Sequence, residues 1–131
     1  MGLHLFDLTG RRALITGSSQ GIGFALAQGL AMAGAQVVLL ARSAAQVAAL
    51  ADEIGPAAMA MGCDVSDWAA VQGAVAAVLA RHGRIDVMIN NAGVMPLSRL
   101  DVLKVDEWNR MIDVNIRGVL HGIAAALPVM Q

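Results

Sequence analysis

Short apolar runs alternate along the chain with segments of helical periodicity, and this alternation restricts the fold more than any other feature. The apolar runs, which predict strands, span residues 12–16, 36–41, 57–63 and 85–89. The helical segments run from Ile22 to Gly34, from Ser43 to Ile54, from Ser66 to Gly83 and from about Asp106 toward Pro128. Ser43 and Ser66 are of the type that caps helix N-termini. Strands and helices that alternate in this way form parallel sheets through right-handed crossovers, so the sequence predicts an α/β fold with a doubly wound parallel sheet.

The turn between the first predicted strand and the first predicted helix is rich in glycine and serine. It reads Thr16-Gly17-Ser18-Ser19-Gln20-Gly21-Ile22-Gly23. A helix N-terminus offers unpaired N–H groups and partial positive charge, and glycines let the backbone approach a pyrophosphate closely. The serine hydroxyls are further candidate donors. Residues 17–23 are therefore candidates for nucleotide binding, with a tight turn that merely tolerates glycine as the structural alternative.

Three further motifs follow in order along the chain. Asp64 follows the third predicted strand, Asn90-Asn91-Ala92-Gly93 follows the fourth, and Asn115 lies in the last helical segment. Together with the Thr-Gly-x-x-x-Gly-x-Gly spacing, they resemble the short-chain dehydrogenase/reductase family from about Phe6 to Gln131. The resemblance implies a Rossmann-type sheet with strand order 3-2-1-4 and a bare fourth strand. It also implies a nicotinamide dinucleotide cofactor and hydride transfer between the nicotinamide and a carbonyl or alcohol carbon.

The resemblance also suggests how the motifs contact the cofactor. Asp64 would accept a hydrogen bond from the adenine amino group, with Val65 beside it, although an Asp here can equally cap a local turn. Asn91, Ala92 and Gly93 would line the nicotinamide-ribose side, unless they form only an Asx-type turn. Val114, next to Asn115, is a further candidate contact.

Asn115 is the candidate catalytic residue. It shares a predicted helical face with Trp108, Ile112, Val119 and Ile123, so we expect a buried amide that needs a hydrogen-bond partner. A bond to a neighbouring backbone group would satisfy it. The family resemblance implies in addition that an Asn here kinks the helix and holds a water of the proton relay.

Arg42 ends the second predicted strand and bears on the choice between NADP and NAD. An acidic residue at about this place would bind the ribose 2′-hydroxyl of NAD, whereas an arginine suits a 2′-phosphate. Ala41 and Arg42 offer no carboxylate, and a guanidinium matches phosphate geometry. We therefore expect NADP, with NAD as the alternative. A solvated arginine at a strand end is the simpler explanation, and Gln20 stands where NADP users of the family often carry a basic residue.

The chain contains no tyrosine and a single lysine, Lys104, which precedes Asn115. The family resemblance places a Ser, a Tyr and a Lys after the Asn-bearing helix, where the Tyr is the acid or base. We therefore expect residues 1–131 to form one dinucleotide-binding domain, the front half of a longer one, that is inactive alone. The alternative is a naturally short, non-catalytic module for dinucleotide binding or dimerisation. A third possibility is an unrelated nucleotide-using α/β enzyme, such as an ATPase or a methyltransferase. The ATPase is disfavoured because the sequence contains no Gly-Lys-Ser/Thr phosphate loop.

Composition restricts the partners. Nine basic and ten acidic residues give a net charge of −1, which predicts no nucleic-acid binding. No metal site is expected, since Cys63 and the histidines lack ligand spacing. Residues 13–41 carry no charge, but their glycines and glutamines favour a buried strand-turn-helix-strand over a membrane span. A lone Cys63 fits a cytoplasmic protein. Resemblance to the family adds a small carbonyl or alcohol substrate and a homo-oligomer in the full-length form.

Overall fold

The computed structural model describes residues 2–131 and contains a four-stranded parallel sheet. The strands are β1 (Arg12–Thr16), β2 (Gln36–Ala41), β3 (Ala58–Gly62) and β4 (Val87–Ile89), in the order β3-β2-β1-β4. The helices are α1 (Gly21–Met32), α2 (Ala44–Ile54), α3 (Trp68–His82), α4 (Val105–Ile112) and α5 (Gly118–Met130), with short 3-10 turns at Gly2–Phe6 and Leu100–Val102. The Rossmann-type sheet and its strand order are as the sequence predicts.

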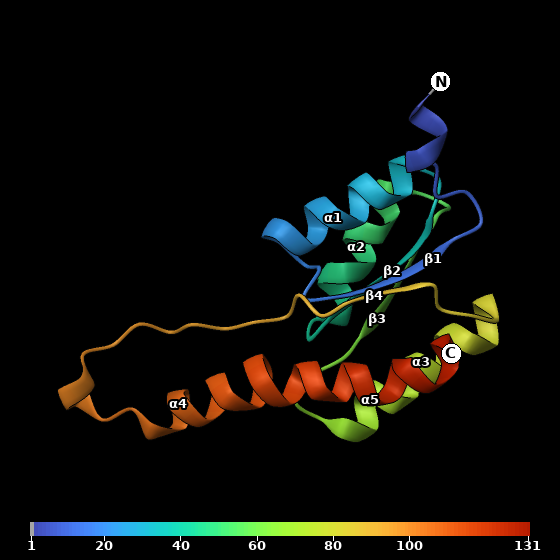
Figure 1. The fold of residues 1–131 in the computed structure, drawn as a ribbon. Coiled ribbons are helices and arrows are strands. Elements are labelled where there is room, and N and C mark those ends of the chain that lie inside the picture. Colours follow the sequence, from blue (N-terminus) through green and yellow to red (C-terminus); the bar gives the residue numbers. More distant parts are fainter. Residues whose placement is uncertain (1) are drawn as a thin grey trace.

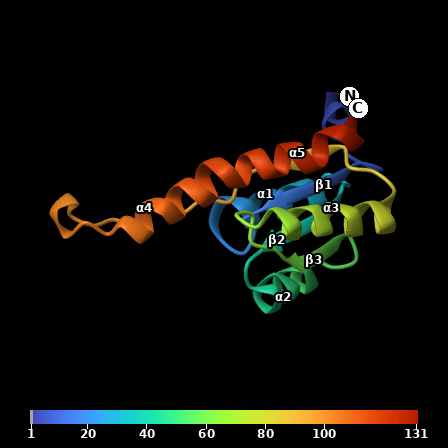
Figure 2. The same ribbon diagram turned by 90° about the horizontal axis from the view of Figure 1, so that it is seen from below.

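Helices α1 and α2 lie on one face of the sheet, and α3 and α5 on the other (Figures 1 and 2). Alternate residues of the central strands separate two apolar clusters. Leu14, Val38 and Leu40 pack toward α3, whereas Ile15 and Leu39 belong to the cluster that includes residues of α1 and α2. Each strand of this central pair is therefore buried on both sides, which explains the nearly continuous apolar run of β2.

The charge-free stretch from residue 13 to residue 41 forms β1, α1 and β2, as expected. A different segment, the continuous helix of Val105–Met130, has the length and composition of a membrane span. In its most apolar 18-residue stretch, 22% is buried within the structure. Core helices of soluble proteins meet the same criterion. Here Val114, Gly118 and Ala126 are buried on the side of the helix that packs against the rest of the molecule.

Helix caps explain two of the helix starts and correct one prediction. Ser43 caps α2, since its hydroxyl accepts a hydrogen bond from the Gln46 N–H, as predicted. Ser66 does not cap α3. The Asp67 carboxylate accepts from the Ala70 N–H instead, because the Ser66 hydroxyl is engaged by Asp64.

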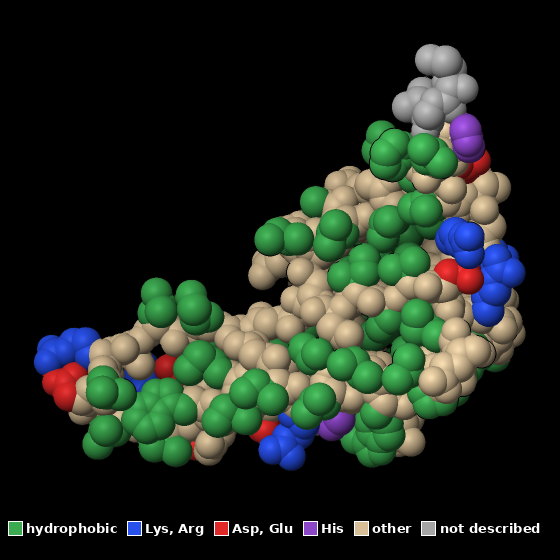
Figure 3. All heavy atoms as spheres, in the orientation of Figure 1, with side chains coloured by type: hydrophobic (Ala, Val, Ile, Leu, Met, Phe, Trp, Pro, Cys, Tyr) green, Lys and Arg blue, Asp and Glu red, His purple; other side chains and the backbone are tan. Residues whose placement is uncertain are grey.

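The last helix and the loop before it project beyond the sheet (Figure 1). Residues 94–104 run outward, and α4 returns toward the body, joined to α5 by a π-helical segment, Asp113–Arg117. Large apolar side chains are exposed along this arm and along α5 (Figure 3). On the continuous helix of Val105–Met130, those that form one series are Ile112, Ile116, Leu120, Ile123 and Leu127, and Val105, Val129 and Met130 near its ends are exposed as well. The residues of the series recur at helical spacing and form an apolar stripe.

Candidate functional site

A cavity of about 750 Å³ lies at the carboxyl ends of the parallel strands, where open α/β sheets bind their ligands. Residues from all four strand ends and from α4 line it. They are Gly17, Ser19, Gln20, Gly21, Ile22, Ala41, Arg42, Ser43, Gln46, Cys63, Asp64, Val65, Asn91, Ala92, Gly93, Val94, Arg110 and Val114. The structure therefore brings together most of the candidate residues of the sequence analysis.

The floor of the cavity is made where the glycine turn meets the loop after β4. The Thr16 hydroxyl accepts hydrogen bonds from the backbone N–H groups of Asn91 (3.1 Å) and Ala92 (3.0 Å). The Asn91 amide nitrogen donates to the Gly17 carbonyl at 3.1 Å. A Cβ on Gly17 would lie 2.6 Å from the Ala92 Cα. The two loops are thus in contact through backbone atoms, and a side chain at position 17 would separate them.

Gly23 acts through packing and does not line the cavity. A Cβ at this position would lie 2.5 Å from both the Asn91 amide nitrogen and the Gly17 carbonyl oxygen. Because Gly23 has no side chain, the first turn of α1 can approach the Gly17 and Asn91 segments that form the floor of the cavity. Gly23 therefore affects the site indirectly, by allowing the helix to pack closely, which is the role of the third glycine in a dinucleotide-binding turn.

Ser18 requires a correction. Its side chain is fully buried and faces β2: the hydroxyl donates to the Ile15 carbonyl and accepts from the Leu40 N–H, both at 3.0 Å. It ties the turn to β2 and is not available to a phosphate. Ser19, the next residue, lines the cavity in its place.

The N-terminus of α1 opens on the cavity without a side-chain cap. Gln20 occupies the cap position and makes no capping hydrogen bond, in contrast to Ser43 and Asp67 at the starts of α2 and α3. Helix N-terminal N–H groups that lack a capping side chain can donate to an anion. The residues of this first turn, Gly21 and Ile22, both line the cavity.

Arg42, Ser43 and Gln46 form the corner of the cavity at the end of β2. Arg42 is exposed, and no hydrogen bond or ion pair of its side chain is found among residues 2–131. The only acidic side chain among the lining residues is Asp64. The corner therefore offers an exposed cation and the start of α2 to a negatively charged group.

Asp64 lines the cavity just after β3, and its carboxylate accepts hydrogen bonds from Ser66 and from Arg110. Its Oδ1 accepts from the backbone N–H of Ser66 (3.0 Å) and from the Ser66 hydroxyl (2.7 Å), while its Oδ2 accepts from Arg110 Nη1 (3.2 Å). Burial raises the pKa of Asp64, but the bonds from Ser66 and the Arg110 guanidinium outweigh it and hold the pKa below its usual value. Asp64 thus forms the local turn that the sequence allowed and also faces the cavity as a carboxylate.

Cys63 lines the cavity next to Asp64. Burial raises the pKa of its thiol, and the carboxylates of Asp64 and Asp67 raise it further. A thiol with a raised pKa stays protonated near neutral pH and is a poor nucleophile.

Asn115 is exposed, so the expectation of a buried amide is wrong. The stripe predicted to bury it is itself partly exposed at Ile112 and Ile123. The expected backbone partner is confirmed: Asn115 Oδ1 accepts from the Val94 N–H and its Nδ2 donates to the Val94 carbonyl, both at 2.8 Å. Asn115 lies in the π-helical segment, where the Gly118 N–H reaches back five residues to the Asp113 carbonyl. The side chain fixes the loop after β4 and does not itself line the cavity.

Six lining residues were not among the candidate site residues of the sequence analysis: Ala41, Ser43, Gln46, Cys63, Val94 and Arg110. Arg110 is the most consequential, because its partner Asp64 lies 46 residues away in the sequence. Among residues 2–131, no group of three or more His, Cys, Asp or Glu side chains is arranged to hold a metal ion.

The cavity at the strand ends, the uncapped helix start and the close glycine packing define a Rossmann-type dinucleotide-binding fold. Comparison with known proteins identifies the family: the sequence model described as short chain dehydrogenase matches residues 11–131. The chain therefore belongs to the short-chain dehydrogenase family.

Individual relatives agree with this assignment. Oxidoreductase UcpA of Salmonella typhimurium is 44% identical over 126 residues, which cover 94% of this chain and 48% of that protein. A metagenomic short-chain oxidoreductase solved in complex with NADP superposes with a TM-score of 0.87 and 40% identity, covering 95% of this chain and 58% of that one. The 3-ketoacyl-(acyl-carrier-protein) reductase of Brucella melitensis, complexed with NADH, gives 0.88 and 37%, covering 93% and 50%. The chain thus spans about half the length of these proteins.

Proposed function

We propose that this chain is the cofactor-binding part of an NADP-preferring oxidoreductase that transfers a hydride between a nicotinamide and a carbonyl or alcohol carbon. The observation that carries the proposal is the cavity at the strand ends, which is lined both by the uncapped start of α1 and by Asp64. The pyrophosphate would bind at the α1 N-terminus, and Asp64 would accept a hydrogen bond from the adenine amino group. When bound, the nicotinamide would donate the hydride to a carbonyl carbon or accept it from an alcohol carbon.

Preference for NADP rests on the corner formed by Arg42, Ser43 and Gln46. A 2′-phosphate placed there would meet the Arg42 guanidinium and the N-terminus of α2, and the one acidic lining side chain, Asp64, is already paired with Arg110. Related structures contain NADP in some cases and NADH in another, so the family alone does not decide the preference.

Turnover is not expected from the 131-residue chain alone. The family's proton transfer relies on a tyrosine, and the sequence has none. Asn115 would contribute by fixing the loop that borders the nicotinamide side, and the π-helical segment around it is where a relay water would be held. A non-catalytic binding or dimerisation module is the second candidate, favoured by the same lack of tyrosine and by the exposed apolar stripe on α5.

We also propose a cellular location and partners for the protein. We place it in the cytoplasm on the evidence of a single, buried cysteine. We expect it to act on a small molecule, without nucleic-acid or membrane partners, and to form a homo-oligomer in its full-length form.

A fluorescence titration with NADPH tests the cofactor site. Gly23→Val should abolish binding, because the new side chain would collide with the Gly17 carbonyl. Gly29→Val in the same helix is the matched control, since a Cβ at Gly29 has no neighbour within 4 Å. Identical titrations of the unaltered chain and Gly23→Val would disprove the site.

Competition by two adenine nucleotides tests the NADP preference. With NADPH bound, 2′,5′-ADP should compete roughly 10- to 100-fold better than 5′-AMP, which is the range expected for a charge-assisted hydrogen bond. Arg42→Ala should reduce this ratio toward one. Equal competition in the unaltered chain would reject NADP in favour of NAD.

The absence of turnover can be measured separately with NADPH and a panel of small aldehydes and ketones. Binding without oxidation of NADPH would agree with the proposal for the isolated chain. Oxidation that depends on the carbonyl compound would contradict it.

A further inference from the structure

Arg110 links α4 to the loop between β3 and α3. Its Nη1 donates to Asp64 Oδ2 at 3.2 Å and to the Ser66 hydroxyl at 3.1 Å. The side chain is about two-thirds buried, with 31% of its surface exposed, and it lines the cavity. One guanidinium nitrogen therefore contacts both residues that define the Asp64 turn.

The hydrogen bonds around Asp64 leave one acceptor position toward the cavity. A carboxylate can accept about four hydrogen bonds, two at each oxygen. Both positions on Oδ1 are used by Ser66, and one on Oδ2 is used by Arg110. The remaining position is on Oδ2, the oxygen whose orientation Arg110 fixes. Since 38% of the side chain is exposed and Asp64 lines the cavity, a ligand can reach it.

We propose that Arg110 is a positioning residue that gives the cavity its selectivity for adenine over hypoxanthine, an inference that rests on the proposed dinucleotide site. Adenine carries an amino group at C6, which donates to a carboxylate. Hypoxanthine carries a carbonyl at C6, which meets the same carboxylate acceptor to acceptor. Discrimination between them requires that the free acceptor position of the carboxylate be held in one orientation. Ser66 holds Oδ1, and Arg110 holds Oδ2, the oxygen that carries this free position.

The opposing explanation is that Arg110 is a structural staple that merely joins α4 to the β3–α3 loop. Loss of a staple would weaken binding of any dinucleotide to the same degree. Loss of a positioning residue would change the ratio of the two affinities. The decisive readout is therefore the ratio of the dissociation constants for NADPH and for the reduced hypoxanthine analogue of NADPH, each followed by nicotinamide fluorescence.

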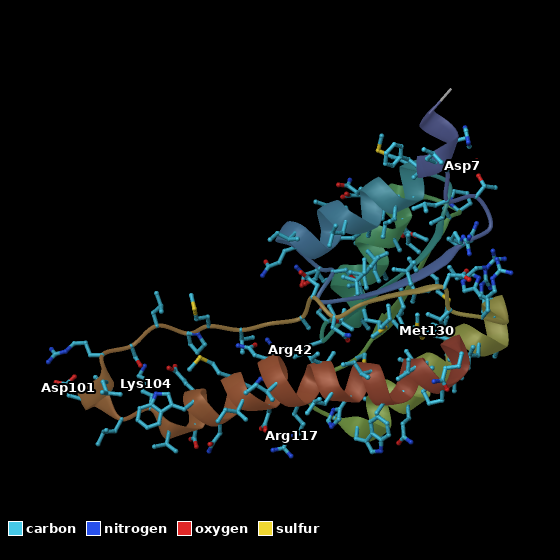
Figure 4. The ribbon with its side chains drawn as sticks, viewed as in Figure 1. Asp7, Arg42, Asp101, Lys104, Arg117 and Met130 are labelled. Carbon is cyan, nitrogen blue, oxygen red and sulfur yellow. The ribbon has the colours of Figure 1, made fainter. Side chains whose placement is uncertain are left out.

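The variants are Arg110→Met, which removes the charge but keeps an extended side chain, and Arg110→Lys, which restores a cation. Arg117→Met is the matched control on the same long helix: Arg117 pairs with Asp113 and points away from the side on which Arg42 lies (Figure 4). The unaltered chain should bind NADPH about 3- to 10-fold more tightly than the analogue, as expected for one net hydrogen bond. Arg110→Met should bring the ratio near one, Arg110→Lys should restore part of it, and Arg117→Met should leave it unchanged.

A measurement without cofactor gives the inference an independent test. The Asp64 carboxyl can be followed by carbon NMR. It is faced by the Arg110 guanidinium from α4 and by the N–H and hydroxyl of Ser66 from its own segment, and the Cys63 thiol is close enough to feel its charge. Arg110→Met should raise the pKa of Asp64, because a stabilising cation is lost. If Arg110→Met does not fold, Arg110→Gln, which also removes the charge, provides the same comparison.

The outcomes separate the inference from the function on which it rests. A ratio that stays the same in Arg110→Met while NADPH still binds overturns the role of Arg110 and leaves the dinucleotide site standing. An unchanged Asp64 pKa in that variant also overturns it. Failure of the unaltered chain to bind either dinucleotide overturns the proposed function, and the selectivity with it.

Discussion

Comparing Gly17→Ala with Gly21→Ala should separate two energetic costs that glycine avoids in this turn: backbone strain at positive φ, and collision of a Cβ with the loop after β4. Gly17 has φ +66°, and a Cβ on it would lie 2.6 Å from the Cα and 2.9 Å from the nitrogen of Ala92. Both neighbours are backbone atoms, so they cannot rotate aside. Gly21 has φ +59° in the same turn, but a Cβ there has no neighbour within 4 Å. Gly21→Ala therefore shares the backbone cost with Gly17→Ala and lacks the collision.

The magnitudes follow from these contacts. A left-handed backbone costs an L-residue about 1–2 kcal/mol, and this is the loss of stability expected for Gly21→Ala. Inserting a methyl group into closely packed surroundings adds about 1–3 kcal/mol. Gly17→Ala should therefore lose about 2–5 kcal/mol in total, a large part of the ~5–15 kcal/mol that stabilises a typical domain.

Urea unfolding at fixed protein concentration measures both losses. The chain has two tryptophans, Trp68 at the start of α3 and Trp108 in α4, whose fluorescence follows the transition, and circular dichroism provides a second probe. The free energies come from linear extrapolation. If Gly17→Ala and Gly21→Ala differ by less than about 0.5 kcal/mol, the ordinary scatter of surface substitutions, the contact between the glycine turn and the β4 loop does not carry the energy assigned to it.

Three further predictions concern other parts of the chain. Asn115→Ala removes both bonds to Val94 and should cost about 1–3 kcal/mol; amide exchange at Val94 should quicken in hydrogen-exchange measurements, and unchanged protection would contradict the assignment. Burial raises the pKa of Asp86, but hydrogen bonds from the Arg12 N–H and from Arg84 and the charge of Arg11 hold it below its ordinary value of 3.8. The Asp86 carboxylate therefore contributes its full stabilisation of the fold above pH 3.8, and this is lost as the pH falls through the lower pKa of the folded state. Asp86→Asn should therefore be less stable near neutral pH, and its unfolding free energy should fall less steeply in acid than that of the unaltered chain; parallel pH profiles would refute this. Gly29→Ala, at an open position in α1, should raise stability by about 0.5–1 kcal/mol in the same urea assay, and a loss would show an unrecognised contact.

The architecture and the composition of the cavity were accessible from sequence because each depends on local pattern. Alternation of apolar runs and helical segments predicts the parallel sheet, and chain order with right-handed crossovers limits how the strands can be arranged. Carboxyl ends of parallel strands share one edge, so motifs that follow the strands must converge there. Arg42, Asp64 and Gly93 meet at one cavity for this reason.

The roles of single side chains were less accessible. Ser18 and Ser19 are chemically alike and adjacent, yet one is consumed by β2 and the other lines the cavity. Backbone direction within the turn decides between them, and composition does not encode it. The cap of α3 was hidden from the sequence for a related reason. The Ser66 hydroxyl is already hydrogen-bonded to Asp64 and to the distant Arg110, so Asp67 caps the helix.

Local periodicity, the glycine spacing and the order of the motifs were thus enough to establish the fold, the family and the place of the cavity. Only the tertiary structure showed that the amide of Asn115 is exposed and fully paired with Val94, and that Arg110 holds Asp64 from 46 residues away. Hydrogen bonds of this kind depend on which loops cross one another and at what distance. The packing of the whole chain sets these distances, and no window of sequence contains them.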